Sequence, residues 1–143
     1  MLRALTFKQG IYLEENKTLT SDKPLKKASR PAQVIIPLLQ HIGVPCKALV
    51  KRGDHVDLGQ KIGDADDCLY APIHSSVSGT VKEIRTVLTP EGKLCEAVVI
   101  EADPEDKLAE GISGKGDLEA ISPEEIINII REAGIVGMGG AMF

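Results

Sequence analysis

The segment VKRGDHVDLGQKIG, residues 50–63, decides the fold of this chain. Turn signals stand at residues 53–54 (Gly-Asp) and 58–60 (Leu-Gly-Gln), because glycine reaches backbone conformations that side chains disfavour and aspartate bonds readily to nearby backbone. Only residues 55–57 lie between the two signals, which leaves room for one very short strand. The segment therefore predicts two tight corners in a flattened β structure.

Short segments rich in β-branched residues lie on both sides of these corners, with Gly, Pro and Asp between them. This pattern is typical of an all-β sandwich or small barrel. Residues 98–100 (Val-Val-Ile) place apolar side chains on both faces of one segment, which predicts an internal strand. Residues 90–92 (Pro-Glu-Gly) predict a hairpin loop. The expected strand segments are AQVIIPLL (32–39), KALVK (47–51), QKIGDA (60–65), SVSGTVKEI (76–84) and EAVVIEA (96–102).

A single helix is predicted over SPEEIINIIREAG, residues 122–134. Ser122 is a good N-cap, Pro123 suits the first helical position, and Glu125 completes a capping box. Gly134 predicts a left-handed stop at the other end. A helix this short is marginal in water and needs a surface to pack on. Its expected apolar face consists of Ile126, Ile127, Ile130 and Ala133, widened by Ile129.

Composition excludes several functions. The chain has four aromatic residues and a net charge of −4, so it lacks both the stacking platforms and the positive charge of a nucleic-acid surface. Its three cysteines form no CxxC pair and are typical of small buried residues in a reducing compartment. No apolar stretch is long enough to span a bilayer. Residues 1–60 are basic and residues 61–143 acidic, which indicates either two solvated faces or a docking surface for a charged partner.

Two stretches carry a resemblance to known proteins. GDHVDLGQKIG (53–63) with APIHSSVSGTVKEI (71–84) resembles the biotinyl/lipoyl carrier fold, a barrel-sandwich hybrid. REAGIVGMGGAMF (131–143) resembles the start of the flavin-binding domain in the flavoprotein subunit of respiratory complex I, with Met142 in place of the usual Gly. Both occur in this order in the C subunit of Rnf-type electron transport complexes. The chain therefore resembles the N-terminal portion of that subunit, cut at the flavin loop.

The resemblance implies three parts. Residues 1–30 are expected to be an extended N-terminal arm, residues 31–112 the barrel-sandwich hybrid domain, and residues 113–143 a linker, a helix and the start of an FMN- and NADH-binding domain. Gly137, Gly139 and Gly140 would cradle FMN, as small residues let backbone amides approach a phosphate. The site would be incomplete, so we expect no cofactor in this fragment.

In the intact subunit the resemblance implies FMN and two 4Fe-4S clusters, which pass electrons between NADH and ferredoxin or membrane partners and couple this transfer to ion movement. The intact subunit would be an enzyme, and the fragment alone an inactive structural and docking module without a catalytic residue. Its partners would be other subunits of the complex. We expect it on the cytoplasmic face of the inner (plasma) membrane of a bacterium, without direct membrane insertion.

Carrier chemistry is not expected. A lipoyl or biotinyl domain presents a modifiable Lys at a hairpin tip, which here falls near residues 64–69, and residues 62–81 contain no Lys. His41, His55 and His74 lack metal-ligand spacing, so we expect no metal, and for His74 a loop position with a bond to backbone. Ser75, Ser76 and Ser78 follow His74 closely, but adjacency does not make a triad.

Two alternatives remain open at this level. One is a free-standing carrier-like binding module, whose glycine-rich tail would be merely disordered. The other is a domain of the kind found in the A subunit of sodium-pumping NADH:quinone reductases.

Overall fold

The structure, a computed structural model, describes residues 14–67, 69–90, 92–114 and 116–138. The chain divides into two compact units, residues 1–30 and residues 31–143. In the first unit, the described residues are all exposed, and Lys17–Leu19 form a short 3-10 helical turn. Gly139 and Gly140 lie outside the described residues, and the expected domain limits stay predictions.

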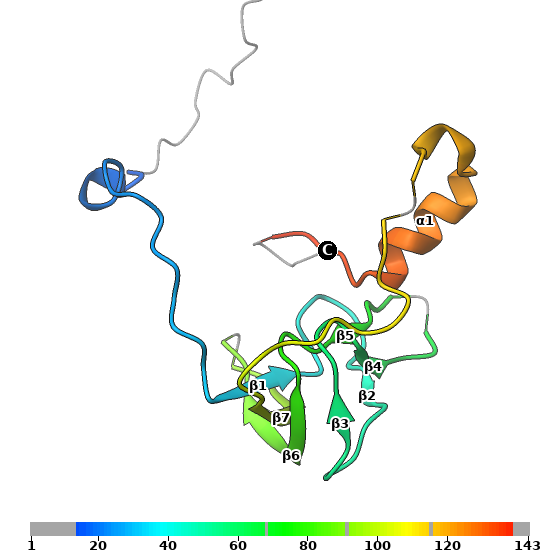
Figure 1. The fold of residues 1–143 in the computed structure, drawn as a ribbon, viewed down its shortest axis with the longest axis horizontal. Coiled ribbons are helices and arrows are strands. Elements are labelled where there is room, and N and C mark those ends of the chain that lie inside the picture. The colour runs from blue at the N-terminus through cyan, green and yellow to red at the C-terminus, as the bar shows by residue number, and fades with distance from the viewer. Residues whose placement is uncertain (1–13, 68, 91, 115, 139–143) are drawn as a thin grey trace, which may run out of the picture. The chain divides into compact units, whose positions relative to one another are not determined.

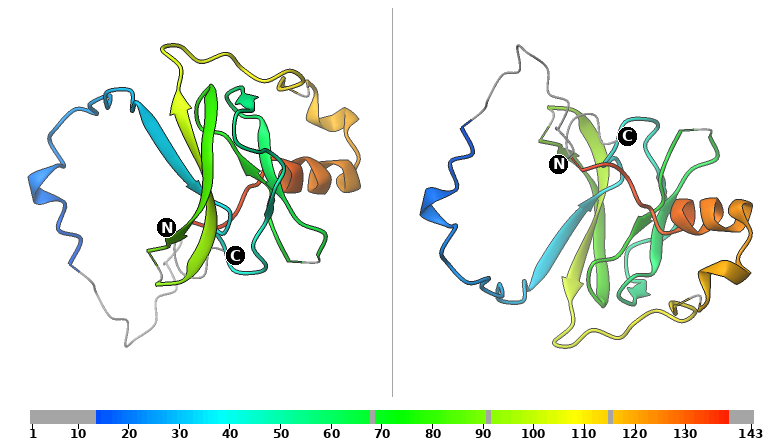
Figure 2. Two further views of the ribbon diagram at one scale, coloured as in Figure 1. Left: turned by 90° about the horizontal axis from the view of Figure 1, so that it is seen from below. Right: turned by 90° about the horizontal axis from the view of Figure 1, so that it is seen from above.

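The second unit is built on two antiparallel sheets (Figures 1 and 2). The four-stranded sheet has the order β1-β7-β6-β3, and the three-stranded sheet has the order β2-β4-β5. This arrangement confirms the mainly β fold. The strands are β1 (Gln33–Pro37), β2 (Lys47–Ala48), β3 (His55–Val56), β4 (Lys61–Asp64), β5 (Ile73–His74), β6 (Gly79–Leu88) and β7 (Leu94–Ala102).

The core lies between the two sheets. Strand β7 pairs with β1 on one side and with β6 on the other, and its residues 97–100 are at most 1% exposed. The prediction of an internal strand at 98–100 is therefore confirmed. Side chains from several strands and loops complete the core, the largest being Leu38, Ile62, Ile100, Val56, Val81 and Val98.

The two corners predicted from residues 50–63 are present. Gly53 and Gly59 have φ angles of 92° and 82°, in the left-handed region that favours glycine. The amide of Gly53 donates to the Val81 carbonyl at 2.8 Å, and the amide of Gly59 donates to the Ser75 carbonyl at 2.8 Å. Each corner is therefore tied to a segment some 16 to 28 residues away, and β3 lies between them.

Ser78 joins a long crossing segment to this corner. Its hydroxyl accepts from the Lys107 amide at 2.8 Å and from the Leu58 amide at 3.0 Å, and donates to the Lys107 carbonyl at 2.9 Å. Its own amide donates to Asp106 Oδ1 at 2.7 Å. Ser78 is 1% exposed. One buried hydroxyl thus holds residues 106–107 against the start of β6.

Strand β1 forms one edge of the four-stranded sheet. The amide of Leu38 donates to the Glu96 carbonyl at 2.8 Å, and Ile36, two residues earlier, is buried. Because strand residues alternate in direction, the nitrogen of Pro37 faces away from β7, where it has no hydrogen to donate. The proline therefore occupies an edge position that costs the sheet no hydrogen bond.

Helix α1 (Pro123–Glu132) has the ends that the sequence predicts. The Ser122 hydroxyl accepts from the Glu125 amide at 3.2 Å. At the other end, Gly134 has a φ of 66°, its amide donates to the Arg131 carbonyl, and the Ile135 amide donates to the Ile130 carbonyl. This pair of bonds is a Schellman motif.

The expected apolar face of α1 is only partly covered. Ile126 and Ile129 are half-buried, whereas Ile127 and Ile130 are 63% and 44% exposed, and Ala133 is also exposed. Within the described residues, much of the expected apolar face is therefore left exposed by the β unit. Among the described residues, none of the helices combines the length and apolar character needed to cross a membrane.

Candidate functional site at the junction of helix and barrel

Lys61 links the three-stranded sheet to α1. It lies on β4, next to the fully buried Ile62, and its side chain is 27% exposed. Its Nζ lies 3.0 Å from Asp64 Oδ2 and 2.5 Å from Glu132 Oε2 on the last turn of α1. The hydrogen bond to Glu132 is the main cause that raises the pKa of Lys61, against the lowering effect of burial. A single ammonium group thus holds two carboxylates from separate elements.

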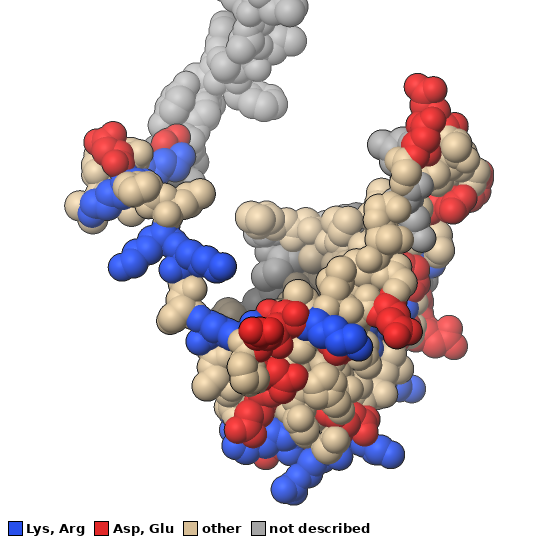
Figure 3. Space-filling view, viewed as in Figure 1, with Lys and Arg blue, Asp and Glu red and all other residues tan. Residues whose placement is uncertain are grey.

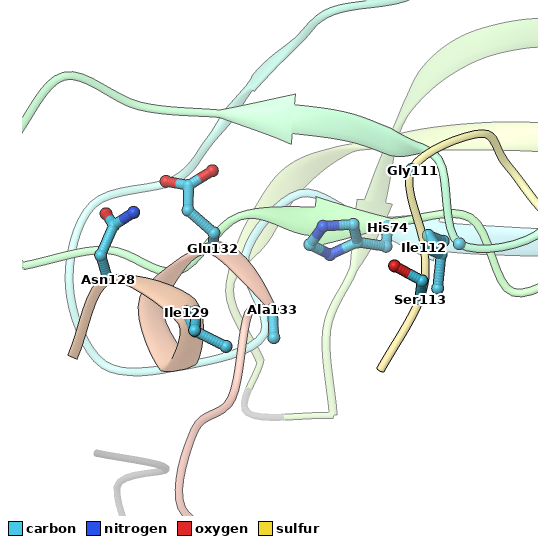
Figure 4. A pocket seen from close by; sticks show the side chains of 9 residues that line it. His74, Gly111, Ile112, Ser113, Asn128, Ile129, Glu132 and Ala133 are labelled. Atoms are coloured by element: carbon cyan, nitrogen blue, oxygen red, sulfur yellow. The ribbon is translucent and has the colours of Figure 1, made fainter. Parts of the chain in front are cut away.

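His74 lies directly opposite Lys61 in the pairing of β4 with β5. Its position on a strand corrects the expectation of a loop, although the ring does bond to backbone, that of Glu132. Burial lowers the pKa of His74, and the charge of Lys61 lowers it further. Figure 4 shows the ring between the end of α1 and residues 111–113.

Gly134 lets the chain leave the helix close to the barrel. A Cβ at this position would lie 2.3 Å from the Pro72 carbonyl oxygen and 3.3 Å from His74 Nδ1. A side chain here would meet both this contact and an unfavourable positive φ. Gly134 therefore ends the helix and also lets the chain pass close to Pro72 and His74 of the barrel.

A cleft of about 540 Å³ opens beside this junction (Figure 4). His74 contributes from the barrel, Asn128 and Glu132 from α1, and Ile112 and Ser113 from the crossing segment. Of these residues, His74 is a candidate from the sequence alone, whereas Asn128, Glu132 and the neighbouring Lys61 were not predicted. These residues form no local motif, because Lys61 and Glu132 stand 71 positions apart in the chain.

An apolar groove of about 260 Å³ lies on the other side of α1. Its helix side includes Ile127, Ile130 and Ile135, and its barrel side includes Ile42 and Leu69. All five are more than 40% exposed. The apolar residues that α1 does not bury against the barrel are therefore gathered here.

The expected FMN loop is described only in part. Gly137 is exposed, and its lack of a side chain would suit the approach of a phosphate. Gly139 and Gly140 lie outside the described residues. The described part of the chain thus contains one of the three expected glycines, and the assignment of all three to FMN stays a prediction.

The remaining two histidines each bond to other parts of the fold. His41 is 5% exposed, with Nδ1 2.7 Å from the Ile42 carbonyl and Nε2 accepting from the Ala71 amide at 3.0 Å. These partners assign the proton to Nδ1. His55 Nε2 lies 2.8 Å from Asp103 Oδ2 at the surface. Within the described ranges, no group of three His, Cys, Asp or Glu side chains is placed to hold a metal ion.

The serines after His74 also bond locally. Ser75 donates to the Val77 carbonyl at 2.6 Å, and Ser78 is engaged with residue 107 as described above. Neither hydroxyl has a histidine partner among these bonds. Both are therefore explained by the folding of the turn before β6.

Charge is distributed unevenly over residues 31–143. Figure 3 shows mostly Lys and Arg at the lower end of the barrel, near the labels β3 and β6 of Figure 1, and Asp and Glu at the far end of α1. The acidic end includes Glu124 and Glu125 in the first helical turn, where they complement the helix dipole. A docking role for either end stays a prediction.

Comparison with known proteins decides the family. The family model described as the RnfC barrel sandwich hybrid domain matches residues 5–105. The chain belongs to this family. Its fold is therefore the barrel-sandwich hybrid that the resemblance implied.

Relatives match over 96% of this chain. The C subunit of a proton-translocating ferredoxin:NAD(+) oxidoreductase complex from Clostridium ljungdahlii is 42% identical over 138 residues. The C subunit of a Na(+)-translocating complex of the same type from Acetobacterium woodii is 41% identical, and that of an ion-translocating oxidoreductase complex from Vibrio cholerae is 37% identical. The chain spans 30%, 31% and 18% of these relatives, respectively. It thus corresponds to an N-terminal RnfC region.

Proposed function

We propose that this chain is the N-terminal part of the C subunit of an ion-translocating ferredoxin:NAD oxidoreductase complex, and that its barrel is a structural and docking module. The proposal rests first on the similarity over 138 residues to the C subunits of such complexes. One structural observation supports the module's role: the barrel holds the last turn of α1 through Lys61 and Glu132. Residues 135–138 would then leave the barrel in a fixed direction, toward the flavin-binding part of the subunit.

The barrel itself supplies no redox chemistry in this proposal. In the intact subunit, FMN and two 4Fe-4S clusters would carry electrons between NADH and ferredoxin or membrane partners. Gly137, Gly139 and Gly140 would contribute backbone amides to the FMN phosphate. The subunit would act as a peripheral protein on the cytoplasmic face of the bacterial inner membrane, held by the other subunits.

A chimera tests the proposal. The 138 aligned residues of the C. ljungdahlii relative are replaced by those of this chain, and the chimera is expressed with the remaining subunits of that complex. We expect the chimera to co-purify with them and to retain FMN, measured by flavin fluorescence after release. The unaltered C. ljungdahlii protein is the positive control. A folded chimera that neither joins the complex nor holds FMN would refute the proposal.

A further inference from the structure

Two residues of the barrel, Lys61 and His74, contact the last turn of α1. The helix buries little apolar surface, with only Ile126 and Ile129 half-buried among its residues 123–132. Apolar burial stabilises by about 25 cal/mol per Å², so two partly covered isoleucines provide a weak attachment. The position of α1 therefore depends strongly on its polar contacts.

Those polar contacts converge on the last turn of the helix. Lys61 Nζ lies 2.5 Å from Glu132 Oε2, and the His74 ring bonds to the Glu132 backbone. Gly134 then passes so close to the Pro72 carbonyl that a Cβ would lie 2.3 Å from its oxygen. All three contacts fall within three residues of chain, immediately before segment 135–138.

We propose that Lys61 and His74 are positioning residues that latch the last turn of α1 to the three-stranded sheet, and that acidification opens this latch. The latch fixes the direction in which residues 135–138 leave the barrel. Its importance for the flavin loop rests on the proposed function above, whereas the latch itself is a property of this chain and is measured on it.

Burial of His74, more than the charges around it, explains the expected response to acid. Lys61 and Asp64 face the ring from β4, and Glu132 faces it from α1. Tyr70 and Arg131 lie in the same cluster, and the charges of Asp64, Glu132 and Arg131 act on the pKa of Tyr70. Burial, the largest cause, and the Lys61 charge keep the pKa of His74 below its ordinary value of 6.5, although the charges of Glu132 and Asp64 and the bond to the Glu132 backbone act in the opposite direction. In the released state the ring regains that value and binds a proton more readily.

This difference in the pKa of His74 weakens the latch as the pH falls. A histidine whose pKa is depressed in the latched state favours that state at high pH, and this preference is lost as the pH falls below about 6.5. A charged imidazole beside the Lys61 ammonium adds repulsion to the cost of burial. We therefore expect α1 to stay seated at pH 7.5 and to detach more often at pH 5.5.

Amide hydrogen exchange of α1 measures the latch directly. Replacement of Lys61 by Met removes the ammonium and keeps much of the apolar stem. We expect the protected amides of α1 to exchange about two- to fivefold faster, the factor expected for a partly exposed ion pair. Lys61→Arg keeps the charge and should retain most of the protection.

A matched control comes from the barrel. Lys107 Nζ lies 3.0 Å from Asp57 Oδ2, which is a similar ion pair without contact to α1. Lys107→Met should leave α1 exchange unchanged. Equal effects of the Lys61 and Lys107 substitutions on α1 would overturn the proposal, because they would indicate a general loss of stability.

The pH dependence of amide exchange in α1 tests the role of His74. After correction for intrinsic exchange rates, wild-type α1 should lose protection between pH 7.5 and pH 5.5, and His74→Gln should flatten that response. An unchanged pH response in His74→Gln overturns the acid switch. Failure of the chimera to hold FMN would instead count against the proposed function and leave these measurements intact.

Discussion

Ser78→Ala tests how the crossing segment is held on the barrel. The substitution removes one hydroxyl at a site that is 1% exposed. The Lys107 amide loses its acceptor at 2.8 Å, and the Lys107 carbonyl loses a donor at 2.9 Å. The Leu58 amide keeps a partner, because it also donates to the Lys107 carbonyl at 2.9 Å.

These losses set the expected magnitude. An amide left without its acceptor costs about 1–3 kcal/mol, and an ordinary hydrogen bond contributes about 1 kcal/mol. Water recovers part of this at Lys107, which is exposed overall. We expect the free energy of unfolding to fall by about 2 kcal/mol.

Urea unfolding, followed by circular dichroism, measures this loss. The midpoint should decrease with an unchanged m-value, since the surface exposed on unfolding stays the same. The hydrogen exchange rate of the Lys107 amide should increase in the same variant. Ser76→Ala is the matched control, because Ser76 is exposed in the same turn. A difference between the two variants of less than about 0.5 kcal/mol would refute the reasoning, since surface substitutions fall within that range.

Three further predictions concern the first residue of β6, the helix end and the absent carrier lysine. Gly79→Ala should lower the free energy of unfolding by about 3 kcal/mol, because its Cβ would lie 2.1 Å from the Glu101 carbonyl oxygen; Gly114→Ala, in open space, is the control for denaturant unfolding. Gly134→Ala should speed amide exchange in α1 while the barrel amides keep their protection, since the clash with Pro72 affects the helix seat; equal loss throughout would contradict this. Intact mass spectrometry of the chain, co-expressed with lipoyl and biotin ligases, should show the unmodified mass of the polypeptide, and an added cofactor would contradict the prediction.

Local signals predicted much of the fold. The corners at Gly53 and Gly59, the internal strand at 98–100 and both ends of α1 depend on a few neighbouring residues, and each is present in the structure. Such features are readable because turn and capping chemistry acts over three to five positions.

The junction between helix and barrel could not be predicted in this way. Lys61 and Glu132 are ordinary charged residues that the fold brings together across 71 positions. The share of the helix face that the barrel covers could not be predicted either, since periodicity shows which residues are apolar but does not show how many of them a neighbouring surface covers. The flavin loop with Gly137, Gly139 and Gly140 stays a prediction from resemblance.

Pro37 has a consequence for the behaviour of the protein at high concentration. An open strand edge is a template on which further chains can add and begin aggregation. On the outer edge of β1, Pro37 offers no hydrogen to an incoming strand, so a ladder started there would lack one of its bonds. Substitution of this proline would therefore be expected to leave the core almost untouched and yet make the purified domain more prone to form fibrils.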